Sequence, residues 1–217
     1  MTGPALLEVW EVCKSYHGRP VLLPVSFTLA AGECLGVVGR NGSGKSTLLR
    51  LLAQVQRPDS GAVLFRGRDV RGDREFPRRR LGYVPQEDAL AEELTVGQQL
   101  SLWQAACGLR GPVPEEIDAL MGLAPLRRRR IADLSGGMRR RTAIAMALLA
   151  RPEILVMDEA TTGLDGDYRS ALLDWMETFL RRGGRAVWCT HLPEEAERLC
   201  GRRLRLEEGR PSWETDP

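Results

Sequence analysis

The chain of 217 residues carries 31 basic and 29 acidic side chains, so its formal net charge at pH 7 is only +2. Hydrophobic residues make up 43% and charged residues 28%, which is typical of a globular domain and excludes a wholly disordered chain. Because the charges nearly balance, composition gives no indication of a nucleic-acid partner. Lysine occurs only at Lys14 and Lys45, and the other 29 basic residues are arginines.

Composition also excludes several classes of site and location. The five cysteines show no C-x-x-C spacing, and with only two histidines a zinc site is not expected. The N-terminal residues 1–8 lack the basic and apolar stretches of a signal peptide, and no apolar run approaches the ~18 residues of a membrane span. We therefore expect a cytoplasmic protein that contacts a membrane only through a partner.

The predicted elements alternate along the chain. Alternating or continuous apolar residues predict strands at 6–12, 25–29, 34–38, 62–65, 154–157 and 186–190. Helical spacing follows Gly44, where Leu48, Leu49, Leu51, Leu52 and Val55 recur, and further helices are predicted at 96–107, 114–121, 138–150, 170–182 and 194–200. The stretch 87–133 has little strand signal and is interpreted as a helical insert. The alternation predicts an α/β fold around a mainly parallel sheet.

A glycine-rich segment between the strand at 34–38 and the next helix fits G-x-x-x-x-G-K-[ST] from Gly39 to Ser46. Glycines let the backbone N–H groups turn inward toward phosphate oxygens, and the following helix adds its positive end. Lys45 is expected to reach the β- and γ-phosphates, and the Ser46 hydroxyl to bind Mg²⁺. The alternative, a purely structural turn, is disfavoured by this strand–helix setting, so the segment predicts nucleotide binding.

Two further segments have the chemistry of a phosphate site. The apolar strand at 154–157 ends in Asp158 and Glu159, where a carboxylate can hold Mg²⁺ and its neighbour can polarise a water as general base. Ser135, Gly136 and Gly137 precede a helix and form a second anion-binding motif, although Ser135 alone could simply be an N-cap. A second motif of this kind suits either a second phosphate site or another molecule's nucleotide.

Together these segments resemble the ATP-binding subunit of ABC transporters over about residues 6–210. In that resemblance, Gly39 to Thr47 is the Walker A loop, Gln86 the Q-loop residue, 134–138 the signature, and 154–159 Walker B. Asp165 lies in the D-loop, His191 is the switch histidine, and Tyr16 stacks on adenine. The implied fold is a P-loop NTPase core of mainly parallel sheet with an antiparallel β subdomain and a helical insert. The implied organisation is a single domain, 1–217, with a core of about 1–86 and 134–217 and a helical subdomain of about 87–133.

The resemblance implies a division of roles among the site residues. Glu159, His191 and Gln86 are expected to be catalytic, and Ser46, Gln86 and Asp158 to hold Mg²⁺. Ser135, Gly136 and Gly137 would contact ATP bound to a partner subunit, and Asp165 would contact the dimer partner. The expected ATP-binding residues are Tyr16, Gly39, Arg40, Asn41, Gly42, Ser43, Gly44, Lys45, Ser46 and Thr47.

Two positions depart from the family pattern: Met138 replaces the usual glutamine of the signature, and Ala160 stands where proline is common. The arginine runs 78–80, 127–130 and 139–141 are interpreted as solvated faces rather than nucleic-acid contacts, because aromatic residues do not interleave them. The run at 127–130 has the alternative of facing acidic lipid or a partner's coupling helix.

The resulting hypothesis is an ATP-binding and ATP-hydrolysing subunit that dimerises around ATP and Mg²⁺, on the inner face of the cell membrane. Its expected partners are a polytopic membrane transporter subunit and a second ATP-binding subunit, identical or not, and an exporter is favoured. The alternative is a soluble ABC-type ATPase that acts on ribosomes or DNA. A regulatory module without turnover is disfavoured because Glu159 and His191 are both present.

Overall fold

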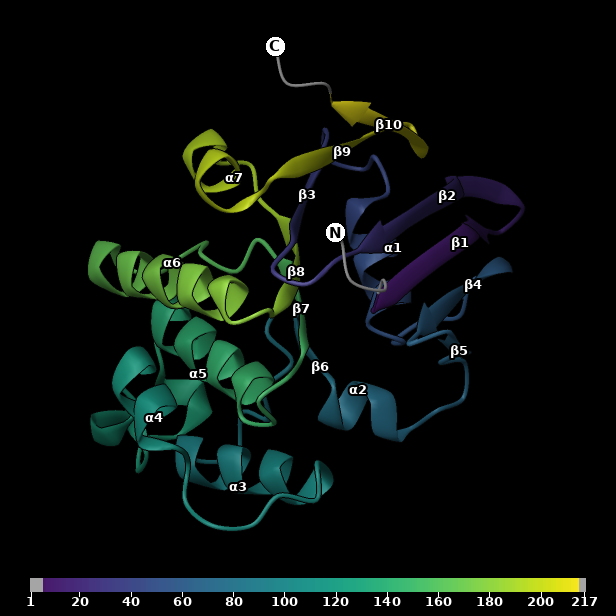
Figure 1. Cartoon of the computed structure of the whole chain (residues 1–217). Helices are drawn as coiled ribbons and strands as arrows, with labels where there is room; N and C mark the ends of the chain where they lie inside the picture. Colours follow the sequence, from purple (N-terminus) through teal and green to yellow (C-terminus); the bar gives the residue numbers. More distant parts are fainter. Residues whose placement is uncertain (1–5, 215–217) are drawn as a thin grey trace.

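The computed structural model describes residues 6–214, and its larger β-sheet has the strand order β10-β9-β3-β8-β7-β6 (Figure 1). Its strands are β3 (Cys34–Val38), β6 (Leu81–Val84), β7 (Ile154–Asp158), β8 (Arg185–Cys189), β9 (Arg202–Glu207) and β10 (Arg210–Glu214). Neighbouring strands run parallel apart from the antiparallel β9–β10 hairpin. The predicted α/β fold around a mainly parallel sheet is confirmed.

The smaller sheet is antiparallel and has the order β2-β1-β4-β5. It consists of β1 (Leu7–Tyr16), β2 (Arg19–Leu29), β4 (Ser60–Phe65) and β5 (Arg68–Asp69). The two-residue turn between β1 and β2 has φ of +50° at His17 and +76° at Gly18, which matches the right-handed twist of a hairpin. The antiparallel β subdomain implied by the family resemblance is therefore present.

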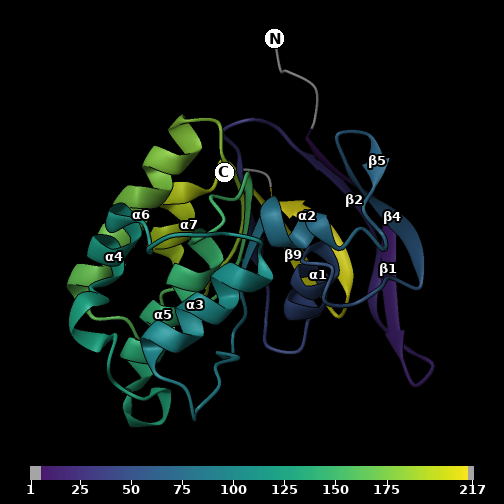
Figure 2. The same ribbon diagram turned by 90° about the horizontal axis from the view of Figure 1, so that it is seen from below.

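The helices lie on both faces of the larger sheet (Figures 1 and 2). Between the two sheets are α1 (Lys45–Leu52) and α2 (Glu75–Arg79). On the other face are α3 (Val96–Ala106), α4 (Glu115–Met121), α5 (Gly136–Leu148), α6 (Gly166–Arg181) and α7 (Pro193–Leu199), with 3-10 helices at Ala124–Leu126 and Ile131–Asp133. Among residues 6–214, none of these helices combines the length and apolar character needed to cross a bilayer.

The pleat of the strands divides the interior into two hydrophobic cores. In β7, Ile154 and Val156 pack toward α1, while Leu155 and Met157 pack toward α5. All five residues of β7 are buried, so this strand has no polar face along its length. Such a continuous apolar strand is typical of a parallel sheet covered on both sides.

The helix α5 is more deeply buried than its apolar residues alone indicate. Every residue from Arg140 to Leu148 is buried, including the two arginines that precede the apolar run at 143–150. The interpretation of the run 139–141 as a solvated face is wrong, because Arg140 is 3% and Arg141 8% exposed. Arg141 stacks on Tyr168, with 4.0 Å between its guanidinium carbon and the ring centroid. Packing between the sheet and the neighbouring helices leaves no solvent-facing side for this helix.

Other boundaries also differ from the predictions. Val55 continues the apolar spacing of α1, but α1 ends at Leu52 and Val55 is 62% exposed. The sequence analysis did not identify α2, β5, β6, β9 or β10. Two of these elements are short, and β9 alternates arginine with leucine, which obscures its apolar character. The expected absence of a signal peptide concerns residues 1–8, of which 1–5 lie outside the described residues.

The close approach of β6 to the end of α5 requires glycine at position 82. A Cβ there would lie 2.5 Å from the carbonyl oxygen of Ala147 and 2.7 Å from Leu155 Cδ2. We expect Gly82→Ala to lower the free energy of unfolding by about 1–3 kcal/mol, measured by urea denaturation. Gly201→Ala is the control, because its Cβ would meet nothing within 4 Å, and its effect should stay below about 0.5 kcal/mol. Equal stability of both variants would contradict this packing.

Candidate functional site

The glycine-rich loop connects β3 to α1 and adopts backbone conformations that require its glycines. Gly39, Gly42 and Gly44 have φ of +145°, +79° and +101°. A Cβ at Gly39 would lie 2.3 Å from the carbonyl oxygen of Leu206, and one at Gly44 would lie 2.6 Å from that of Val21. The loop thus wraps tightly against the neighbouring backbone, as a loop that cradles phosphate must.

Lys45, the first residue of α1, folds back across this loop. Its Nζ donates to the carbonyl oxygens of Gly39 and Arg40, at 2.8 and 2.9 Å. The loop is held from outside by the β9–β10 turn, where the N–H of Gly209 donates to the carbonyl oxygen of Ser43 at 3.1 Å. The ammonium group is therefore held against the loop backbone by two hydrogen bonds, and Lys45 lines the neighbouring cavity, where an anion can be bound.

A cavity of about 370 Å³ lies beside the loop and unites residues from distant parts of the chain. Gln86, which follows β6, and Glu159, which follows β7, face the loop across it. The remaining lining residues are Val21, Asn41, Gly42, Gly44, Lys45, Ser46 and Thr47. The predicted Walker A, Q-loop and Walker B residues thus meet in one place, and Val21 is a lining residue that the sequence analysis missed.

Asp158 ends β7 and offers an unused acceptor. The residue is 2% exposed, and its Oδ2 has no hydrogen-bond partner among the described residues. A buried carboxylate oxygen without a partner is costly unless a cation or donor satisfies it. Ser46 and Gln86, which line the cavity, and Asp158, which does not, all offer oxygen atoms, and oxygen is the ligand type that Mg²⁺ prefers.

Glu159 has a strained backbone with φ of +50°, unusual for a residue that is not glycine. Its N–H donates to the carbonyl oxygen of Cys189 at 2.9 Å, and its side chain is 17% exposed. The predicted switch residue lies beside it: His191 Nδ1 is 3.7 Å from Glu159 Oε2. Strained residues of this kind cluster at functional sites, and Glu159 is one of the residues that line the cavity.

The turn that carries His191 is fixed by a buried carboxylate. Glu195, which is fully buried, accepts hydrogen bonds from Thr190 Oγ1 at 2.8 Å and from Arg169 Nε at 2.8 Å. The N–H of Leu192 in turn donates to Thr190 Oγ1 at 3.1 Å. His191 itself remains largely exposed, on a turn that these hydrogen bonds hold in place.

Tyr16 and Lys14 lie at the end of β1, outside the lining of the phosphate cavity. The Tyr16 hydroxyl donates to Gln56 Oε1, and Lys14 Nζ lies 5.8 Å from the ring centroid. Lys14 Nζ also forms an ion pair with Asp59 Oδ1 at 2.6 Å, which accounts for this second lysine. That hydrogen bond, with one from the Ser15 N–H, lowers the pKa of Asp59.

The signature and D-loop residues lie together but away from the cavity. Ser135 caps α5 by accepting the N–H of Met138 at 3.3 Å, and Asp165 is the N-cap residue of α6. A Cβ at Gly137 would lie 2.6 Å from the carbonyl oxygen of Gly163, so the two segments touch. Neither Ser135, Gly136 and Gly137 nor Asp165 borders the cavity of their own chain.

The sequence analysis missed one residue that reaches the site from behind. Arg140 of α5 donates to backbone carbonyls of both the Gln86 segment and the Glu159 segment. Its position one helical turn before the apolar Ile144 is a local signal of burial, and the adjacent Arg141 is buried as well.

Comparison with known proteins places the chain in a family. A family model described as ABC transporter matches residues 22–162. The chain is 40% identical over 215 residues to Nod factor export ATP-binding protein I of Rhizobium sp. (strain N33), covering 97% of this chain and 71% of that protein. It is also 40% identical to the protein of that name from Mesorhizobium japonicum, covering 95% and 62%. The chain thus spans about two thirds of these relatives.

Two solved structures have the same fold. One is described as the structure of an ATP-binding subunit of an ABC transporter, with a TM-score of 0.87, 31% identity, and coverage of 97% of this chain and 90% of that chain. The other is a dimeric ATP-binding cassette in a post-hydrolysis state with ADP and Pi, with a TM-score of 0.84 and 24% identity. It covers 95% of this chain and 98% of that chain.

Because Lys45 is held close to the loop backbone, we expect ATP binding to need the slim shape of the lysine side chain as well as its positive charge. We expect Lys45→Met and Lys45→Arg both to weaken ATP binding by at least about tenfold, because the planar guanidinium does not fit the closed loop. Fluorescent-nucleotide titration measures the dissociation constant, and thermal unfolding checks that both variants fold. Full binding by Lys45→Arg would contradict the steric argument, and full binding by Lys45→Met would contradict the site.

Proposed function

The chain belongs to the ABC transporter family, and from that premise we propose that it hydrolyses ATP at the Lys45 cavity to power an exporter. The observation that carries the proposal is the meeting of Lys45, Gln86 and Glu159 around one cavity. The loop supplies inward N–H groups and Lys45 supplies positive charge for the β- and γ-phosphates. Tyr16 is proposed to support the adenine ring by stacking.

Bound Mg²⁺ would neutralise phosphate charge, and the residues that would hold it are Ser46, Asp158 and Gln86. The unpartnered Oδ2 of Asp158 supports this assignment. Glu159 acts as general base on the attacking water, because its carboxylate faces the cavity opposite the phosphate loop. His191, which lies beside that carboxylate, contacts the γ-phosphate. This contact is lost when hydrolysis releases the γ-phosphate.

The proposed assembly is a head-to-tail pair in which each ATP lies between two chains. The phosphate loop precedes α1, which packs on one face of the larger sheet, whereas the signature precedes α5 on the other. The two anion-binding motifs of one chain therefore lie at helices on opposite faces of its larger sheet. In the pair, Ser135, Gly136 and Gly137 meet the ATP held by the partner, and Asp165 touches the partner.

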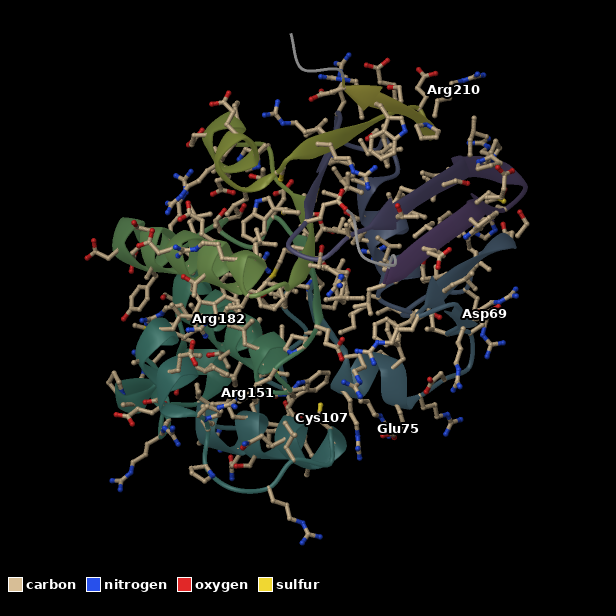
Figure 3. The ribbon with its side chains drawn as sticks, in the orientation of Figure 1. Asp69, Glu75, Cys107, Arg151, Arg182 and Arg210 are labelled. Atoms are coloured by element: carbon tan, nitrogen blue, oxygen red, sulfur yellow. The ribbon has the colours of Figure 1, made fainter. Side chains whose placement is uncertain are left out.

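A groove of about 430 Å³ is proposed as the docking site of the membrane subunit. Its lining includes Pro77 and Arg78 of α2 and also Cys107, the residue after α3, which is labelled in Figure 3. Its lining includes Leu90 and Trp103, and Pro85 and Glu87 bring the Gln86 segment to its wall. An amphipathic helix of the membrane subunit would lay its apolar side in such a groove. The chain would then be peripheral on the cytoplasmic face.

Export is the proposed direction, supported by the names of the relatives, which are ATP-binding proteins of Nod factor export. The relatives give no support to the alternative of a soluble ATPase on ribosomes or DNA. The helical region at about 87–133 is proposed as a subdomain of a single domain, supported by its two α helices and two 3-10 helices outside the sheets.

The role of Glu159 predicts a separation of binding from turnover. We expect Glu159→Gln to keep ATP affinity within about twofold, because the amide preserves shape, and to lower kcat by at least about a hundredfold. The variant should also accumulate an ATP-bound dimer, measurable by size-exclusion chromatography with light scattering. An unchanged kcat for ATP hydrolysis in Glu159→Gln would contradict the assignment of Glu159 as the general base.

The groove predicts a position-dependent loss of the membrane partner. Trp103 lines the groove and is 39% exposed, whereas Trp213 on β10 is 44% exposed and lies outside the groove lining. We expect Trp103→Glu to abolish co-purification of a polytopic membrane protein from detergent-solubilised native membranes, and Trp213→Glu to preserve it. Equal recovery with both variants would contradict the docking site, and recovery of ribosomes with the unaltered chain would favour the alternative function.

A further inference from the structure

Arg140 is a buried cation placed directly behind the candidate catalytic residues. Its side chain is 4% exposed, and its guanidinium donates to five carbonyl oxygens and one carboxylate. Burying a charge is costly unless hydrogen bonds and an opposite charge compensate for it. The hydrogen bonds and the ion pair of the guanidinium indicate that this arginine has a defined role in addition to packing.

On one side, the guanidinium is hydrogen-bonded to the backbone on and around Glu159. Its Nη2 donates to the carbonyl oxygens of Asp158 and Glu159, each at 2.7 Å, and its Nε donates to that of Ala160 at 3.0 Å. Three consecutive carbonyls reach one guanidinium where the backbone of Glu159 has its positive φ. The hydrogen bonds therefore compensate for strain at the residue whose carboxylate faces the cavity.

On the other side, the same guanidinium holds the Gln86 segment. Its Nη1 donates to the carbonyl oxygen of Pro85 at 2.6 Å and lies 3.5 Å from that of Gln86. It also forms an ion pair with Asp88 Oδ1 at 2.8 Å, which balances its charge. The planar fork of arginine can meet these divergent acceptors at once, whereas the single ammonium of lysine cannot.

We propose that Arg140 is a positioning residue that links the Gln86 segment to the backbone of Glu159 and holds the catalytic carboxylate in its working orientation. The proposal rests on the proposed function of Glu159 as general base. Because Pro85 and Glu87 line the proposed docking groove, a partner that shifts this segment also shifts the Arg140 contacts to Glu159. Occupancy of the groove is thereby connected to hydrolysis through one side chain.

The test compares Arg140→Lys with Arg139→Lys in the full chain. Arg139 is the adjacent residue of α5, and its side chain forms an ion pair with the exposed Glu92 at 2.6 Å, which a lysine can maintain. We expect Arg140→Lys to lower kcat by about tenfold to a hundredfold, as a small misplacement of a reacting group does. The KM for ATP should change by less than about twofold, since Lys45 and its loop are untouched. Arg139→Lys should leave both constants unchanged.

A second variant, Asp88→Asn, tests the proposal if Arg140→Lys does not fold. Asp88→Asn removes only the balancing charge, from a side chain that is 16% exposed, and should lower kcat by a few-fold at unchanged KM. In the Glu159→Gln background, Arg140→Lys should still permit the ATP-bound dimer, because binding and closure do not need the aligned carboxylate. Thermal unfolding accompanies every variant.

The outcomes separate this proposal from the proposed function. If the unaltered chain fails to hydrolyse ATP, the proposed function is wrong and the Arg140 role falls with it. If the unaltered chain hydrolyses ATP but folded Arg140→Lys keeps its kcat, only the positioning role is overturned. If Arg140→Lys does not fold, an unchanged kcat in Asp88→Asn overturns it. A parallel loss of ATP affinity and kcat indicates a general structural defect and likewise contradicts it.

Discussion

The structure depends on one constraint: neighbouring parallel strands end at the same edge of a sheet. β3, β8 and β7 are adjacent, so the phosphate loop, the turn of His191 and the Asp158–Glu159 pair emerge side by side although about 150 residues separate Gly39 from His191. Gln86 joins them because β6 is the next strand along. The two hydrophobic cores hold this sheet from both faces, so the position of every proposed catalytic group follows from strand order.

The parts of this arrangement that the sequence predicted are those with local causes. The bounds of β3 follow from a short apolar run before Gly39, and the loop from glycines that alone tolerate its backbone. The cap of α5 follows from Ser135, and the Asp158–Glu159 pair from the end of an apolar strand. These features depend on a few consecutive residues, which is why pattern and spacing suffice to identify them.

The features that escaped prediction depend on partners distant in sequence. Arg140 and Arg141 have the same side chain as the partly exposed Arg139 beside them, and their burial is decided by carbonyls near residues 85 and 158 and by Tyr168. The role of Lys14 likewise depends on a distant residue, because its side chain forms an ion pair with Asp59. Val55 follows the apolar spacing, but α1 ends before it. In each case tertiary packing overrides the local pattern, because burial and charge compensation are properties of the folded chain.

We propose that ATP is hydrolysed between the phosphate loop of one chain and the signature of another. Mixing two inactive variants, Lys45→Met and Ser135→Arg, distinguishes such a shared site from a site within one chain. A mixed pair contains one intact composite site, formed by Lys45 of one chain and Ser135 of the other, so ATP hydrolysis should reappear on mixing. A site complete within one chain would be damaged in both variants, and a mixture that stays inactive would contradict the account.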